Sequence, residues 1–191
     1  MPKAWNWTKS LVGQLEFYWD AHLWPRLGGL TDDEYLWEPV PDCWSIRSGP
    51  GGRWIADSAP AEAVPTEQLA PFTTIAWRMA HISVGCFATR TSTFFGDGSI
   101  PDADMFDARH HPASLPRTAA DALDYLEETY RRWHDAIAVL DAQQLLTPLG
   151  PKGSWFASDP MAELILHVNR EVMHHGGEIG VLRDLYARSL G

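Results

Sequence analysis

Residues 167–178 of the chain read HVNREVMHHGGE, and the stretch from Met161 to Tyr186 around them carries apolar residues at alternating spacings of four and three. This spacing puts the apolar side chains on one side of an α-helix. His175 falls in the middle of that side, and Glu171 lies about one helical turn before it. The stretch therefore predicts a long amphipathic helix that directs a histidine and a carboxylate toward a protein core.

Three further segments show helical periodicity, at about residues 7–27, 73–95 and 118–140, and the long helix itself is expected over residues 160–188. The sequence contains no run of convincing strands. Four amphipathic helices of this length are typical of an all-α four-helix bundle. We expect the bundle to form a single domain over residues 1–191.

The first two helices are joined by a long crossover, residues 30–72, which is rich in Pro, Gly and Trp. Connections of this length are usually functional or contain small elements of their own. Residues 43–47 and 52–55 are short apolar segments that we expect to pair as a minor hairpin. So large a crossover also predicts a bundle that is not a simple up-down-up-down arrangement.

The composition excludes several classes of partner. The formal net charge is −10, with 15 Lys and Arg against 25 Asp and Glu, which argues against nucleic acid because its phosphates require clustered basic residues. No apolar run approaches the roughly 20 residues that cross a bilayer. Residues 1–10 lack the apolar stretch of a signal peptide. Two cysteines supply no disulfide framework, so we expect a reducing, cytoplasmic compartment.

The predicted core position of Glu171 requires a partner, because an ionised carboxylate in a core costs several kcal/mol unless it is paired or binds a cation. His81, in the second helix, lies among small residues and would complete a set of two histidines and one carboxylate with Glu171 and His175. Such a set binds a divalent metal and leaves coordination positions open. Zinc or ferrous iron fits these ligand types, and nickel and manganese remain candidates. The alternative is a buried Glu–His hydrogen bond that only satisfies its two partners.

The chain resembles the DinB-like four-helix metal-binding superfamily, which includes the amino-terminal domain of mycothiol-dependent maleylpyruvate isomerase and related thiol S-transferases. The resemblance covers nearly the whole chain. The motifs that carry it are WRMAH at 77–81, HVNREVMHHGGE at 167–178, LRDLY at 182–186, YLWEP at 35–39 and CWSIR at 43–47. Many relatives carry His-x-x-x-His where this sequence carries Glu171-x-x-x-His175, and the isomerase branch also has Glu at the first position.

The resemblance implies that His81, Glu171 and His175 are metal ligands, of zinc in the first place. It also implies chemistry on a low-molecular-weight thiol such as mycothiol or bacillithiol, with S-transfer to an electrophilic small molecule. A metal with open positions binds a thiol and presents it as a thiolate at neutral pH. The 191 residues do not contain the second, arginine-bearing domain of the isomerase branch, so we expect transfer rather than isomerisation. Some relatives are dimers, which makes a homodimer possible.

Four further residues are predicted to serve this site. Glu178 and His174 are candidates for proton transfer or for orienting the ligands, against the alternative that they are solvated or structural polar residues. Trp77, one turn before His81, and Trp44, in the crossover, are expected to contact the bound thiol in an apolar pocket above the metal.

A different class of function is a non-catalytic, stress-related bundle protein whose metal only stabilises the fold. Open coordination positions would favour the enzyme, whereas full ligation by His167 or His174 would favour the structural role.

The remaining candidates receive structural or solvent-facing roles. We expect His22 to form a core hydrogen bond, and His110 and His111 to be solvated in their loop. Cys86 is expected to be a small core residue that faces away from the site, about 140° from His81 around the second helix.

Overall fold

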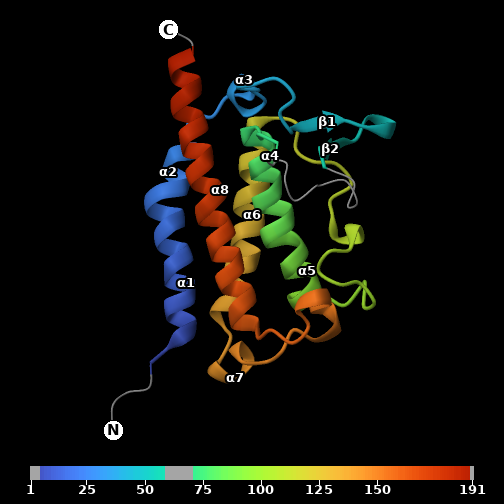
Figure 1. The fold of residues 1–191 in the computed structure, drawn as a ribbon. Coiled ribbons are helices and arrows are strands. Elements are labelled where there is room, and N and C mark those ends of the chain that lie inside the picture. Colours follow the sequence, from blue (N-terminus) through green and yellow to red (C-terminus); the bar gives the residue numbers. More distant parts are fainter. Residues whose placement is uncertain (1–4, 59–70, 190–191) are drawn as a thin grey trace.

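The computed structural model describes residues 5–58 and 71–189 and shows an all-α bundle (Figure 1). Two parts of the segments discussed above lie outside these ranges: residues 59–70 of the crossover, and residues 1–4 of the stretch considered for a signal peptide. The first long helix is continuous and consists of α1 (Trp7–Tyr18), a π-helical turn (Trp19–Leu23) and α2 (Trp24–Leu27). Its bounds are those predicted from the sequence.

The other three long helices also lie within two residues of their predicted bounds. The second consists of α4 (Ile75–Ala80), a π-helical segment (His81–Ala88) and α5 (Thr89–Phe95). The third is α6 (Ala119–Ala138), and the fourth is α8 (Met161–Ser189). Polar side chains cap the first three at their N-termini, because Asn6, Thr74 and Thr118 each accept a backbone N–H of the first turn.

The connections between the long helices contain short elements of secondary structure. They are α3 (Asp32–Tyr35), α7 (Ala142–Leu145) and three 3₁₀ turns at Pro50–Gly52, Ala108–His110 and Gly150–Phe156. The predicted hairpin is confirmed as β1 (Ile46–Ser48) paired antiparallel with β2 (Trp54–Ala56), with Ile46 opposite Ala56. It begins later than expected because Trp44 instead bridges to Thr73, which attaches the hairpin to the start of α4.

The four helices do not alternate in direction. α1 and α8 run parallel, and α4–α5 and α6 run parallel to each other in the opposite direction (Figure 1). The side chain of Asn169 donates to the carbonyl of Leu11 at 2.9 Å, and the Tyr18 hydroxyl donates to the carbonyl of Met173 at 3.1 Å, so residue numbers rise together along α1 and α8.

The expectation that the bundle is not up-down-up-down is therefore correct. The crossover of residues 30–72, however, is not its cause. The crossover from α2 to α4 begins and ends at the same end of the bundle (Figure 1). The connection from Gly96 to Thr118 runs the length of the bundle instead, and this makes α5 and α6 parallel. A connection's length in residues does not reveal where it ends, so the sequence could not distinguish the two.

The core lies between the four helices and is rich in aromatic rings. Trp19 of the first helix stacks on Tyr130 of α6, with ring centroids 3.7 Å apart, and Trp133 of α6 is fully buried. None of the helices in the described ranges has the length and apolar character needed to cross a bilayer.

The inward face of the first helix follows a spacing that an undistorted α-helix would not sustain. Beside the buried Thr8 and Val12, one row of buried residues recurs at every fourth position, through Leu11, Leu15, Trp19, Leu23 and Leu27. A strict spacing of four drifts around an α-helix, but the π-helical turn at Trp19–Leu23, with its i→i+5 bonds, corrects the drift. The predicted core hydrogen bond of His22 is wrong, since this residue is exposed and its ring stacks on Tyr18.

Candidate metal centre

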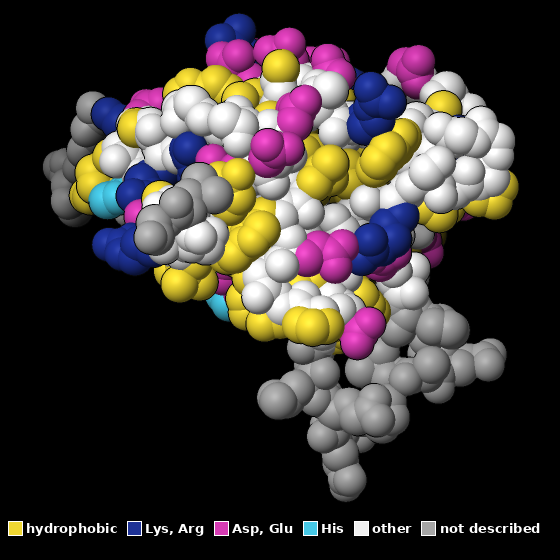
Figure 2. Space-filling view, turned by 90° about the horizontal axis from the view of Figure 1, so that it is seen from above, with side chains coloured by type: hydrophobic (Ala, Val, Ile, Leu, Met, Phe, Trp, Pro, Cys, Tyr) yellow, Lys and Arg dark blue, Asp and Glu magenta, His cyan; other side chains and the backbone are white. Residues whose placement is uncertain are grey.

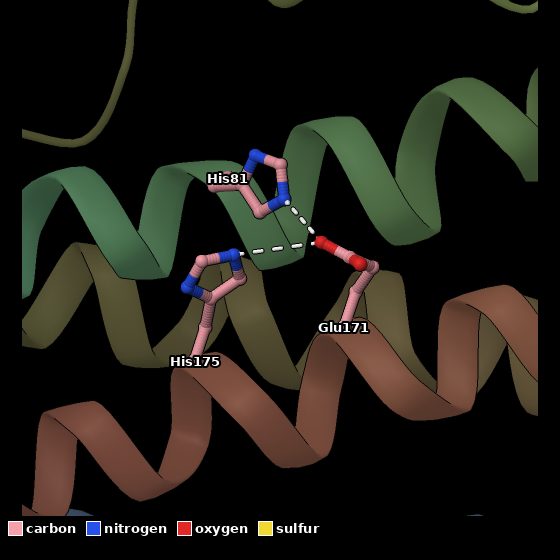
Figure 3. Close-up of side chains that lie close together, drawn as sticks. All are labelled: His81, Glu171 and His175. Atoms are coloured by element: carbon pink, nitrogen blue, oxygen red, sulfur yellow. Dashed lines mark hydrogen bonds and ion pairs between the residues drawn. The ribbon is translucent and has the colours of Figure 1, made fainter. Parts of the chain in front are cut away.

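Three side chains predicted as metal ligands meet between the second helix and α8 (Figure 3). His81 Nε2 lies 3.4 Å from Glu171 Oε2, and His175 Nε2 lies 3.5 Å from the same oxygen. All three side chains are half-buried, and their donor atoms lie within 4.8 Å of one another. Two imidazole nitrogens and a carboxylate oxygen therefore converge on one small volume.

The second helix holds His81 by packing on one side of its ring. His81 opens the π-helical segment, and π-helical turns are frequent at functional sites. The indole of Trp77 stacks on the imidazole, with centroids 5.4 Å apart and planes 5° apart, and its N–H donates to the carbonyl of Asp57 at 2.8 Å. On the other side a Cβ at Gly85 would lie only 3.6 Å from His81 Nδ1. The small residue thus leaves the hollow beside the imidazole that the sequence predicted.

A chain of polar contacts behind His175 sets its protonation. Glu178 Oε2 lies 2.7 Å from His175 Nδ1 and also accepts Nη1 of the buried Arg78. A carboxylate paired with arginine has no proton to donate, so the hydrogen-bond network assigns the proton to Nδ1 of His175. His175 Nε2 then carries a free lone pair that points toward Glu171.

These contacts fit a bound cation. With Nδ1 protonated, His175 Nε2 and Glu171 Oε2 are two acceptors that face each other at 3.5 Å. Two acceptors in a half-buried position repel unless a cation or a proton lies between them. A donor set of two imidazoles and one carboxylate suits zinc or ferrous iron, and an outer carboxylate on the ligating histidine is the usual support of such a site.

The protonation states at neutral pH suit metal ligation. Burial lowers the pKa of His175 to about 4, with the charges of His81 and His174 acting in the same direction. Burial also lowers the pKa of His81. Burial alone would raise the pKa of Glu171, but the hydrogen bond from His81 and the charges of His167, His81 and His175 together outweigh burial and lower the pKa. Two neutral imidazoles and an ionised carboxylate are the forms that bind a divalent metal.

A cleft of about 340 Å³ opens beside His81. Its walls come from the hairpin, the second helix and the loop before α6. The lining residues are Trp54, Ile55, Ala56, Asp57, Ser58, Trp77, Ala80, His81, Val84, Gly85, His111, Pro112 and Leu115. Trp77, predicted to lie in the pocket, is part of the cleft wall, together with Trp54 of the crossover. Trp44 lies behind Trp77, with ring centroids 5.9 Å apart, and is not among the lining residues.

The structure separates the roles predicted for Glu178 and His174. Glu178 is engaged by Arg78 and His175 Nδ1, so it is placed to orient a ligand rather than to face the cleft. His174 points outward, with a side chain 62% exposed, and its Nε2 lies 3.4 Å from Glu178 Oε1. His167 donates no third nitrogen to the group, since its Nδ1 lies 3.9 Å from Glu171 Oε1 and contacts Arg170 at 2.7 Å.

Sequence reasoning missed two residues near the centre. Arg78 is 7% exposed and compensates the charge of Glu178, but an arginine one residue after Trp77 gave no sign that it points inward. His111, predicted to be only solvated, lines the cleft beside His81, and burial lowers its pKa. His111 lies in a loop, where no periodicity indicates the direction of a side chain, so the sequence did not predict that it lines the cleft.

Two other expectations need correction. His110 is half-buried rather than solvated, because its ring nitrogens contact the hydroxyls of Ser92 at 2.9 Å and Thr93 at 3.2 Å. Cys86 is a buried core residue as predicted, but the angle that separated it from His81 does not hold. Burial raises its pKa to about 12, and the charge of Glu171 contributes to the increase. The π-helical segment between His81 and Cys86 invalidates the α-helical angle used to separate them.

Comparison with known proteins gives one match. The family model described as the DinB superfamily matches residues 53–179, a span that includes all three clustered side chains. No curated protein and no solved structure was found to match the chain.

Proposed function

The chain belongs to the DinB superfamily, and from this premise we propose that it is a metal-dependent enzyme that transfers a low-molecular-weight thiol to an electrophilic small molecule. The observation that carries the proposal is the convergence of His81 Nε2, His175 Nε2 and Glu171 Oε2, with the outer nitrogen of His175 held by Glu178. His81, Glu171 and His175 would hold the metal, and zinc suits this donor set.

The chemistry that a zinc ion supplies in such a site is to lower the pKa of a bound thiol, so that it reacts as a thiolate at neutral pH. The residues of the chain provide position and proton transfer. Trp77 keeps His81 in place by stacking, and Glu178 keeps His175 in the tautomer with a free Nε2. The neutral imidazole of His111 lies in the cleft wall and can accept a proton there.

The cleft beside His81 supports an enzyme rather than a purely structural metal protein. A structural site is closed by protein ligands, whereas a catalytic site keeps a position open. His167 and His174, the two residues whose ligation would have favoured the structural role, point to Arg170 and to Glu178. The cleft borders His81, and its apolar walls with Trp77 and Trp54 suit an organic molecule.

The partners follow from this proposal: a mycothiol- or bacillithiol-like thiol and a small electrophile, with Trp77 in the cleft wall near the thiol and Trp44 packed behind Trp77. Figure 2 shows basic side chains scattered among acidic ones on the face seen from above, which does not resemble the continuous basic surface that a nucleic acid needs. Both cysteines are buried and free, in keeping with a cytoplasmic location.

Metal analysis of the purified protein tests the site. Wild-type protein isolated without chelator is expected to contain close to one zinc per chain by mass spectrometry, and the His81→Ala and Glu171→Ala variants are expected to contain almost none. His22→Ala, an exposed histidine on the first helix, is the matched control and should retain the metal. Equal and negligible metal in all four proteins would refute the site.

A thiol-consumption assay tests the reaction. The zinc-loaded protein is incubated with mycothiol, bacillithiol or glutathione and a panel of electrophiles, and loss of free thiol is followed with and without chelator. Metal-dependent consumption of one thiol supports the transferase. A protein that binds zinc stoichiometrically but consumes no thiol with any pair would favour the non-catalytic bundle instead.

A further inference from the structure

One buried cation is left without a role by the proposed function. Arg90 of α5 is 8% exposed, and within residues 5–58 and 71–189 no carboxylate lies within 4.0 Å of its nitrogens. The other buried arginine, Arg78, is paired with Glu178. A buried charge without a paired counter-charge costs several kcal/mol, so an anion that reaches this guanidinium would be stabilised by it.

The guanidinium of Arg90 is oriented by neutral groups, and the nearby charge of Asp104 acts on it without forming an ion pair. Its Nη1 donates to the carbonyl of Met105 and lies 3.4 Å from the hydroxyl of Thr89, and the ring of Phe106 covers it with the centroid 4.9 Å away. Nε is buried and has no hydrogen-bond partner. Nη2 makes no hydrogen bond in the described part of the chain. The group is therefore fixed in position with donors to spare, as in sites that bind a carboxylate.

A second pocket, of about 330 Å³, adjoins this guanidinium. It lies between α5, the loop that follows it, the Gly150–Phe156 turn and the first half of α8. The lining residues are Arg90, Met105, Phe106, Leu149, Phe156, Asp159, Glu163, Leu164, His167 and Arg170. Most of the wall is apolar, and the volume suits a small organic molecule.

Exposed aromatic side chains surround the mouth of this pocket. Phe106 is 43% and Phe156 47% exposed, and Trp155 is 84% exposed with its ring 5.3 Å from that of Phe106. Ser154, just before them, has φ 53° and ψ −121°, a backbone conformation that side-chain-bearing residues rarely adopt. The aromatic rings beside this strained residue are exposed to solvent, and exposed apolar surface of this kind indicates a binding site.

The charges around the pocket are unequally placed. Asp159 and Glu163 lie at the start of α8, and Arg170 is an exposed arginine whose side chain is 70% exposed. Of the charged lining residues, Arg90 is the one that is buried. An anionic group would therefore pair with the buried Arg90, and an aromatic group would contact the exposed rings at the mouth of the pocket.

We propose that this pocket binds a small aromatic carboxylic acid, with the carboxylate on Arg90 and the ring against the edge that Phe106 and Phe156 form at the mouth. His167 lines the pocket, and its Nδ1 lies 3.9 Å from Glu171 Oε1, so the bound acid would lie about one helical turn from the metal centre. The binding itself requires no metal. That the acid is the electrophile or the product of the reaction rests on the proposed function.

Calorimetric titration of the full-length, metal-depleted protein tests the pocket with 3-phenylpropionate and its neutral amide as probes. Wild-type protein is expected to bind the acid and to bind the amide at least about tenfold more weakly, because the amide lacks the charge that Arg90 requires. Arg90→Gln should weaken the acid by about tenfold or more, and the matched rim variant Arg170→Gln by less than about threefold.

Phe156→Ala keeps the test decisive if Arg90→Gln does not fold, since Phe156 is half-exposed and its loss leaves the core intact. This variant should weaken the acid but leave thermal unfolding close to that of the wild type. Equal affinity for acid and amide, or an acid affinity that depends on Arg170 and not on Arg90 or Phe156, would overturn the proposal. Metal content is measured separately, so a failure here leaves the metal centre standing, and loss of the metal centre leaves this binding intact.

Discussion

Glu178 determines which nitrogen of His175 is free, although it does not point into the cleft. Removing the carboxylate by Glu178→Ala frees Nδ1 of His175 and leaves Arg78 buried without a partner. We expect zinc affinity to fall by about 10- to 100-fold, as is typical when an outer partner of a ligating histidine is lost. Competition with a chromophoric chelator measures the change.

Two variants control for this prediction. Glu178→Gln keeps an acceptor for the Nδ1 proton and should weaken zinc binding less than Glu178→Ala. His174→Ala removes the exposed neighbour that had been predicted as a catalytic alternative and should leave zinc affinity nearly unchanged. If His174→Ala has the larger effect, the structure assigns the outer partner wrongly.

The buried imidazole of His175 makes the metal-free protein sensitive to acid. Its pKa is about 4 in the fold and has an ordinary value of 6.5. Between these values the unfolded chain binds more protons than the folded one, so the free energy of unfolding falls as pH decreases from 6.5 toward 4. Urea unfolding of the metal-free protein at several pH values measures this slope, and His175→Asn should make it shallower. A slope that is unchanged in the variant would contradict the assignment.

At the scale of single residues, the sequence predicted the three clustered side chains but not the residues that support them. Periodicity identified His175 and Glu171 because both fall on the apolar side of one helix. Arg78 and Arg90 were missed, since an arginine on a helix is normally solvent-facing and its burial depends on helices and loops far away in the chain. Contacts between distant elements leave no local pattern.

At the scale of the helix, two adjacent glycines in α8 differ in how closely the first helix approaches them. A Cβ at Gly176 would lie 2.6 Å from the Tyr18 hydroxyl and 3.2 Å from Leu23 Cδ1, whereas nothing lies within 4 Å of a Cβ at Gly177. Gly176→Ala should destabilise the protein by about 1–3 kcal/mol through overpacking against the first helix. Gly177→Ala should stabilise it by about 0.5–1 kcal/mol through helix propensity. Chemical denaturation measures both, and equal effects would contradict the close approach.

The π-helical turns limit how well the faces of the helices can be predicted. The bounds of all four long helices were predicted within two residues, because caps and periodicity are local signals. The predicted angle between His81 and Cys86 was wrong, because both residues lie in the π-helical segment His81–Ala88. An α-helical angle assumes a uniform number of residues in each turn, and an inserted residue is not visible in the sequence.

At the scale of the whole molecule, one ion pair attaches the crossover to the last helix. Arg183 of α8 donates to both carboxylate oxygens of the buried Glu34, at 2.8 and 3.1 Å, and also to the carbonyl of Gly28 at 3.0 Å. Glu34→Ala should lower the free energy of unfolding by about 3 kcal/mol, because it leaves Arg183 without its counter-charge. Glu127→Ala, which removes the exposed pair with Arg131, should cost less than about 1 kcal/mol. Similar losses in the two variants would contradict the prediction.

The architecture was predicted more completely than the path of the chain. Four amphipathic helices without long strands leave few alternatives to a bundle, so the fold class followed from local patterns. The direction of the helices depends on where each connection ends. That is decided by contacts such as the hydrogen bond from Leu115 to Trp54, which joins two connections distant in sequence.

The parallel pairing of α1 and α8 has a consequence for biosynthesis. Asn169 and Leu11, which are hydrogen-bonded in the fold, are separated by 158 positions in the chain. At about 5–20 residues per second, the ribosome completes α8 roughly 10–30 s after α1 has been made. During that interval the first helix can pack on the second helix, where Trp19 contacts Phe87, and then on α6, where Trp19 stacks on Tyr130. In the nascent chain, α1 therefore stays partly exposed until α8 has been synthesised. During that interval its apolar side chains are accessible to chaperones.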